Sequence, residues 1–147
     1  MLPGFNLVLR NIGATLLGLF VGSLFNGALI SLNAFVLFPM PAGASMEDPV
    51  AFQAYLDTLP TAAFLVVMVA HLGQASLGGW IAARLGSSRP VLLAMIVGSL
   101  SLLGGVINMV TIKGPPWFYV ELPLYLLVAY TAGNIEAKRR AGLKPPA

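Results

Sequence analysis

The chain has 147 residues, of which 58% are hydrophobic and only 9% are charged, with a formal net charge of +3. Soluble domains carry about 25% charged residues, so a soluble fold could not cover its surface with these few polar groups. The absence of cysteine and the single histidine exclude disulfides and thiol chemistry, and they argue against a zinc or haem site. We therefore expect the lipid bilayer as solvent, no metal site and no nucleic-acid partner, and no cofactor is identified.

Four apolar stretches have the length and composition expected of membrane-crossing helices, which need about 20 residues. They cover about residues 12–38, 61–83, 91–112 and 117–135. Pro123 removes a backbone donor near the start of the last stretch, so that helix should start late or kink. The sequence predicts an all-α integral membrane protein, a single domain over 1–147 folded as a bundle of four transmembrane helices.

A polar segment separates the first two stretches and carries its own helical signal. Asp48 followed by Pro49 is suited to cap and open a helix. Phe52, Tyr55 and Leu59 then recur at helical spacing on one face. We expect a short amphipathic helix over about 49–59, lying in the headgroup region of the bilayer within the first outer loop.

The distribution of basic residues predicts the orientation. Only Lys113 falls on one side of the four predicted spans, and the other seven basic residues fall on the opposite side. These seven are Arg10, Arg84, Arg89, Lys138, Arg139, Arg140 and Lys144. The positive-inside rule then places both termini in the cytoplasm, which predicts a multi-pass protein of the inner (cytoplasmic) membrane with both ends inside.

Polar side chains within the spans form two layers when depth is counted at about 1.5 Å per residue. The midplane layer contains Asn26, His71, Gln74, Ser101 and Tyr125, and the outer layer contains Asn33, Asn108 and Glu121. Because polar groups in a bilayer face the bundle interior or a watery cavity, we expect these residues to form an intramembrane cluster that acts as a binding site or proton path.

His71 and Glu121 are the titratable members of this cluster that could carry a proton near neutral pH. Their counted depths differ by about 10 Å, so the sequence leaves direct contact between them open. A neutral His71 bonded to Asn26, Ser101 or a backbone carbonyl is one alternative. The corresponding alternative for Glu121 is a solvated position near the outer surface, paired with Lys113.

Small residues at helical spacing predict close helix packing. The candidates are Gly18, Gly22, Gly27, Gly79 and Gly105. The pattern does not distinguish packing inside one chain from packing between copies.

Several short runs resemble a pattern found in small, uncharacterised four-span bacterial membrane proteins. These runs are Ala70-His71-Leu72-Gly73, Gly79-Trp80-Ile81-Ala82-Ala83, Gly104-Gly105-Val106-Ile107-Asn108 and Pro116-Trp117-Phe118. The resemblance covers roughly the C-terminal 70 residues and includes an acidic residue early in the fourth span, here Glu121. It implies the four-span fold and topology and no activity.

Three functions fit these observations. The favoured hypothesis is a non-catalytic accessory or structural subunit, bound to other membrane proteins or to copies of itself, because the short loops leave almost no soluble domain. The alternative is a small oligomeric transporter or channel, which could be proton-coupled through His71 and Glu121. An enzyme with His71 as general base is the least favoured, since no catalytic residues or nucleophile motif accompany the histidine.

Overall fold

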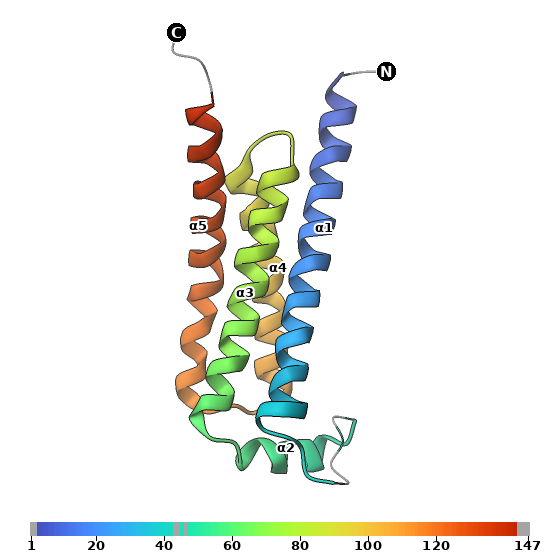
Figure 1. Ribbon diagram of the computed structural model, residues 1–147, viewed down its shortest axis with the longest axis vertical. Helices are drawn as coiled ribbons and strands as arrows, with labels where there is room; N and C mark the ends of the chain where they lie inside the picture. The colour runs from blue at the N-terminus through green and yellow to red at the C-terminus, as the bar shows by residue number, and fades with distance from the viewer. Residues whose placement is uncertain (1–2, 43–44, 46, 144–147) are drawn as a thin grey trace.

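The computed structural model describes residues 3–42, 45 and 47–143, and all regular secondary structure in this part of the chain is helical. Four long helices run side by side, and a short helix lies across one end of them (Figure 1). The long helices are α1 (Pro3–Leu32), α3 (Thr61–Leu85), α4 (Pro90–Thr111) and α5 (Glu121–Gly142), and the short one is α2 (Pro49–Asp57). The predicted all-α fold is confirmed.

Three of the long helical segments are long and apolar enough to cross a membrane, as expected of a membrane protein. They are Gly4–Leu37, Thr61–Leu85 and Pro90–Thr111. Helix α5 is the exception among the four predicted spans. Its apolar run covers only the 14 residues from 122 to 135, between Glu121 and Glu136, and runs of that length are more typical of buried core helices.

The first and last long helices differ from their predicted bounds. Helix α1 begins at Pro3 instead of residue 12, and the part that precedes the predicted span is anchored to the end of α3 and the loop after it by two polar residues. Arg10 Nε donates to Leu85 O at 2.9 Å, and Asn11 Oδ1 accepts from Ser87 N at 2.7 Å. The α1 segment ends in one π-helical turn, η1 (Asn33–Leu37). Lys144, part of the charge prediction, lies outside the described residues.

The fourth helical segment starts late, as Pro123 predicts. Residues Pro116–Val120 form a 3₁₀ helix, η2, and α5 begins only at Glu121. Helix α5 then continues to Gly142, seven residues past the predicted end at 135. Its charged last turns contact the C-terminal end of α3 instead of ending at the apolar boundary.

Helix α2 forms where an amphipathic helix was predicted. The Asp48 carboxylate accepts hydrogen bonds from Val50 N at 2.9 Å and Ala51 N at 3.2 Å, which caps the helix. Tyr55 is buried and donates to Phe38 O at 2.5 Å. Helix α2 is therefore tied to the end of the α1 segment, and it lies across that end of the bundle (Figure 1).

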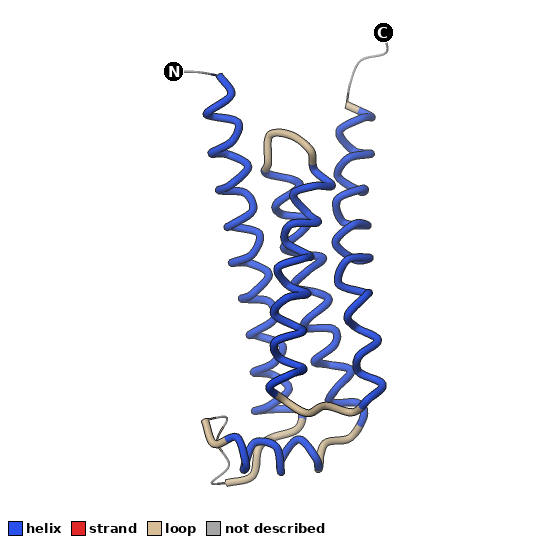
Figure 2. Tube along the Cα trace, turned by 180° about the vertical axis from the view of Figure 1, so that it is seen from behind, coloured by secondary structure: helices blue, strands red, loops and turns tan. Residues whose placement is uncertain are grey.

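Helix α3 is the centre of the bundle and packs against α1, α4 and α5, whereas α1 has little contact with α4. A Cβ on Gly22 would lie 2.6 Å from Gln74 O, and one on Gly18 would collide with Gly78 O, so both glycines allow α1 to approach α3 closely. A Cβ on Gly79 would lie 3.4 Å from the Cβ of Ala94, which is an ordinary contact distance between α3 and α4. The two ends of the described chain, near Pro3 and Gly142, lie at the same end of the bundle and on opposite sides of the α3–α4 loop (Figure 2).

Gly27 does not have its predicted role inside the chain. No atom lies within 4 Å of the position that a Cβ on Gly27 would take. The α1 segment still contacts α3 on both sides of Gly27, at Asn26 and in η1, so Gly27 lies on a face of α1 that α3 does not cover.

Candidate functional site

His71 of α3 and Glu121, the first residue of α5, form a buried pair. His71 Nδ1 lies 3.0 Å from Glu121 Oε1 and 3.2 Å from Oε2. Glu121 is 0% exposed and His71 is 7% exposed. His71 therefore bonds to Glu121, whereas the alternative was a bond to Asn26, Ser101 or a backbone carbonyl. Glu121 is wholly buried and does not occupy the solvated position near Lys113.

The counted difference in depth of about 10 Å between these residues was too large. The count used the α-helical rise of about 1.5 Å for residues 117–120, but η2 is a 3₁₀ helix with a rise of about 2.0 Å. Glu121 therefore lies deeper than expected, and the lengths of the two side chains cover the remaining distance.

Aromatic rings hold the histidine in place. Its ring stacks on Tyr125, with centroids 6.3 Å apart and an interplanar angle of 25°, and packs against Phe118 at 6.2 Å. The Tyr125 hydroxyl donates to Glu121 Oε1 at 3.5 Å. Because Nδ1 faces the carboxylate, the other ring nitrogen, Nε2, is left without a hydrogen-bond partner among the described residues.

His71 also lines two adjoining cavities. The inner cavity has a volume of about 270 Å³, and the outer one, about 720 Å³, extends beneath α2. The residues that line both are Asn26, His71, Gly104 and Asn108. The cavities are thus neighbours along the groove between α1 and α4, the two helices that have little contact with each other.

The walls of these cavities contain polar atoms without partners. Asn26 Nδ2 donates to Gln74 Oε1 at 2.5 Å, but Asn26 Oδ1 is buried and unbonded, and so are Asn33 Oδ1 and Ser101 Oγ. Buried polar atoms in native proteins nearly always have a partner, and exceptions require an explanation. A bound polar group in the cavities would provide one.

The structure brings the eight predicted cluster residues together. Seven of them line a cavity, and Glu121 lies behind His71. The inner cavity is lined by Asn26, His71, Gln74, Ser101, Asn108 and Tyr125, and Asn33 lines the outer one. Gly105 also lines the inner cavity. A Cβ there would lie 2.6 Å from the Tyr125 hydroxyl oxygen, so the glycine makes room for the tyrosine.

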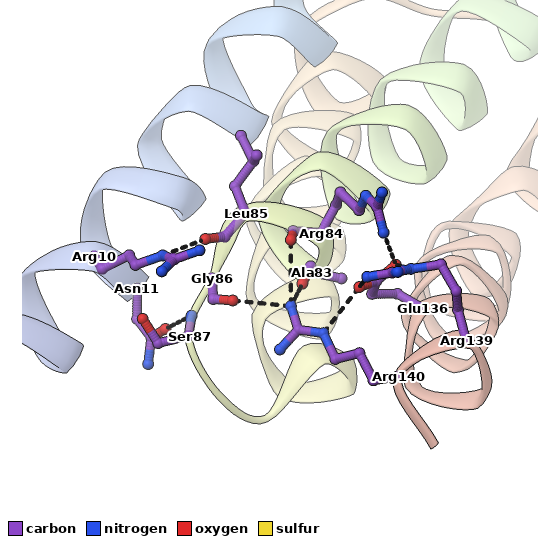
Figure 3. A network of polar contacts seen from close by, with 10 residues as sticks. All are labelled: Arg10, Asn11, Ala83, Arg84, Leu85, Gly86, Ser87, Glu136, Arg139 and Arg140. Carbon is purple, nitrogen blue, oxygen red and sulfur yellow. Dashed lines mark hydrogen bonds and ion pairs between the residues drawn. The ribbon is translucent and has the colours of Figure 1, made fainter. Parts of the chain in front are cut away.

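A second polar cluster, at the opposite end of the bundle, was not predicted. Glu136 of α5 is 0% exposed and accepts hydrogen bonds from Arg139 at 2.6 and 2.7 Å and from Arg140 at 2.8 Å, and it pairs with Arg84 at 3.5 Å (Figure 3). The i,i+3 and i,i+4 spacing of Arg139 and Arg140 from Glu136 is a sequence signal that could have identified it.

This arginine cluster, defined as Arg84, Glu136, Arg139 and Arg140, also caps helix α3. Arg140 donates to Ala83 O, to Gly86 O at 2.8 Å and to Arg84 O at 3.3 Å. Such bonds satisfy carbonyls that a helix end leaves free. The hydrogen bonds from Arg139 lower the pKa of Glu136 from 4.5 to about 2, with Arg140 and Arg84 adding to the effect. Glu136 is therefore a permanent anion near neutral pH.

The comparisons with known proteins do not assign the chain to a family. No protein-family model, no curated protein and no solved structure matches it significantly. The resemblance to small four-span membrane proteins stays a prediction.

Proposed function

We propose that the chain is a small proton-coupled membrane transporter in which the His71–Glu121 pair carries the proton. The observation that supports this most strongly is the position of the pair: His71 contacts a wholly buried carboxylate through one ring nitrogen and also lines two cavities. Intramembrane ionisable residues on a cavity wall mark ion and proton pathways.

The chemistry of the pair suits the transfer of one proton at a time. When His71 is neutral and Glu121 ionised, Nδ1–H donates to the carboxylate, Nε2 is an acceptor, and the pair has a charge of −1. A proton arriving at Nε2 makes the pair neutral overall, which lowers the cost of burying the carboxylate. Nε2 is thus the atom through which a proton enters or leaves the pair from the cavity.

The proposal includes the full predicted topology, in which α5 is the fourth span of an inner-membrane protein and both termini lie in the cytoplasm. The arginine cluster supports this orientation, because it lies at the same end of the bundle as Arg10 and the α3–α4 loop. Since the chain has no cysteine, a single cysteine introduced at Glu47 should react with a membrane-impermeant maleimide from outside whole cells. Labelling only in inverted vesicles would reverse the orientation.

The groove between α1 and α4 supports an oligomeric transporter. Helices α1 and α4 each pack on α3 but have little contact with each other, so a single chain leaves the groove between them without a wall of its own. A second copy packed across this groove would complete the enclosure of the cavities.

A pH jump tests the proposal without knowledge of the substrate. The protein is reconstituted in liposomes adsorbed to a solid-supported membrane, and the displaced charge is recorded when the external pH changes. We expect a displacement that is mostly lost in Glu121→Gln and in His71→Gln and is retained in Glu47→Gln, which removes the same charge from an exposed position. Equal displacement in all four proteins, or none in the wild type, would overturn the proposal.

The accessory-subunit hypothesis stays a prediction, favoured by the outward-facing apolar side chains of α1. Leu16, Phe20 and Leu24 are all exposed, and a partner subunit could cover them, although lipid covers such a face equally well. Native mass spectrometry of the protein extracted in lipid-preserving polymer separates the two functions. Stoichiometric foreign subunits would favour the accessory role, and copies of this chain alone would favour the transporter.

A further inference from the structure

The two cavities have walls of different chemistry. The outer cavity is lined mainly by apolar side chains, among them Ile30, Leu56, Leu59 and Val67, whereas the inner one is lined mainly by polar groups and glycines. A volume of about 720 Å³ is within the range of about 300–1,000 Å³ typical of small-molecule sites. The walls therefore fit an amphiphile with its apolar body in the outer cavity and its polar group in the inner one.

The charges around the cavities select among polar groups. Neither Lys nor Arg occurs among the described residues that line either cavity. The carboxylate of Glu121 pairs with His71, which lines both cavities. An anionic group would find no basic partner here and would be repelled by Glu121, so anions are disfavoured.

Two of the three unbonded polar atoms in the cavity walls indicate that the bound group donates hydrogen bonds, and the third, Ser101 Oγ, can accept or donate one. Asn26 Oδ1 and Asn33 Oδ1 are acceptors only, and each is buried without a partner. Amine N–H groups satisfy such atoms, whereas a carbonyl or ether oxygen does not.

Aromatic rings along the outer cavity add attraction for a positive charge. Phe52, Phe64 and Phe118 line it, and Phe64 and Phe118 pack edge to face at 6.0 Å. Ring faces attract ammonium and related cations, and the attraction is stronger where the site is partly desolvated. The same rings accept an apolar or aromatic body.

We infer that the substrate is an organic cation with an apolar body and an N–H-bearing head, exchanged for one proton at His71. The inference rests on the proposed transport function. An N–H of the cation can donate to Nε2 only when this atom has no proton, so cation and proton compete for one lone pair. One cation enters as one proton leaves, and the charge in the cavity is unchanged.

The groups facing His71 are consistent with a single exchangeable proton. Glu121 and Tyr125 are the titratable side chains that face it from α5. Helices α1 and α4 contribute Asn26, Ser101 and Asn108 to the same cavity, none of which titrates near neutral pH.

Ethidium is a suitable probe because it is a permanent aromatic cation with amino N–H donors. Its binding to the purified protein in non-ionic detergent is measured by fluorescence anisotropy against protein-free micelles. Proton competition predicts binding about tenfold weaker at about pH 6 than at about pH 8, the range in which histidine changes charge. Glu121→Gln removes the buried anion and should weaken binding at the higher pH about tenfold, and His71→Gln removes the competing lone pair and should abolish the pH dependence, while Glu47→Gln binds as the wild type does.

The wild-type protein alone also tests the inference, should Glu121→Gln fail to fold. An anionic dye, anilinonaphthalene sulfonate, should not compete with ethidium. Equal competition by the anion, equal affinity at both pH values, or unchanged binding in a folded Glu121→Gln protein would overturn the inference. If the pH-jump charge displacement is present while ethidium does not bind, the substrate class is wrong and the transporter proposal stands. If that displacement is absent, the transporter itself is wrong.

Discussion

The two ends of the bundle each bury one glutamate of α5, and they treat it in opposite ways. Both Glu121 and Glu136 are 0% exposed. Glu136 is held by three arginines, and both of its carboxylate oxygens accept charged hydrogen bonds. Glu121 is held only by His71 and a long bond from Tyr125, beside cavities with unbonded polar atoms.

The difference separates a structural carboxylate from an exchangeable one. A glutamate bonded to several arginines keeps its charge at any physiological pH, because its partners do not lose their protons. A glutamate bonded to a histidine has a partner whose own charge changes near neutral pH. We therefore propose that Glu136 serves stability and that the His71–Glu121 pair serves the proposed transport function.

Replacing each glutamate by glutamine in turn gives the strongest test of the difference between Glu136 and Glu121. Glu136→Gln leaves three arginines without their anion and should lower the free energy of unfolding by about 2 kcal/mol. This is less than the 3–5 kcal/mol typical of fully buried pairs, because the arginines are partly exposed. Glu121→Gln keeps an acceptor for His71 and removes a buried charge, so its stability should stay within about 0.5 kcal/mol of the wild type. Thermal unfolding followed by circular dichroism in non-ionic detergent measures both.

Equal losses in the two variants would contradict the assignment. A large loss in Glu121→Gln with a small one in Glu136→Gln would reverse it.

The pH dependence of the free energy of unfolding tests whether Glu136 contributes to stability as an anion. The pKa of Glu136 is lowered to about 2 from 4.5, so its contribution is complete above the unfolded value and is lost as the pH falls through the folded one. The difference in stability between the wild type and Glu136→Gln should therefore be constant above about pH 5 and should shrink as the pH falls from 4.5 towards 2. Unfolding midpoints of both proteins across this range test it, and a difference that persists unchanged at the acid end would contradict it.

Two glycines of α1 provide a matched pair with a smaller expected effect. Gly22→Ala forces a Cβ against Gln74 O and should destabilise the protein by about 1.5 kcal/mol. Gly27→Ala enters open space and should leave stability unchanged or raise it by about 0.5 kcal/mol through its better helix propensity. Denaturation midpoints of the two variants give the comparison, and equal losses would indicate that Gly27 packs against a second copy.

These glycines also show what the sequence could predict. Apolar stretches and the Asp48-Pro49 pair predicted the helices, because hydrophobic length and capping act locally. The polar cluster was predicted because polar side chains must avoid lipid, which restricts each helix to one buried face. Gly27 has no packing partner inside the described chain, and its predicted packing role between copies stays a prediction, because helical spacing does not reveal which face of a helix a neighbour covers.

The contact between His71 and Glu121 required the structure. It depends on a 3₁₀ segment, η2, that changes the depth of Glu121, and on two helices far apart in the chain. The arginine cluster was missed for a related reason. Glu136 lies just past the predicted end of the fourth span, where a charged residue is ordinarily solvated, and only the longer helix α5 brings it against Arg84 and the end of α3.

The smallest predicted effect concerns the cover of the cavity end. Gln53 of α2 donates to Lys113 O at 3.0 Å and accepts from Lys113 N at 3.2 Å, and these exposed bonds tie α2 to the loop after α4. Gln53→Ala should cost only about 0.5 kcal/mol and should roughly double hydrogen exchange in α2, with Glu47→Ala as an exposed control. Because α2 lies over the outer cavity, ethidium should also enter faster, whereas the arginine end should exchange as before. Unchanged exchange in α2 would show that Tyr55 alone holds the cover, and increased exchange throughout the bundle would show that the two ends are not independent.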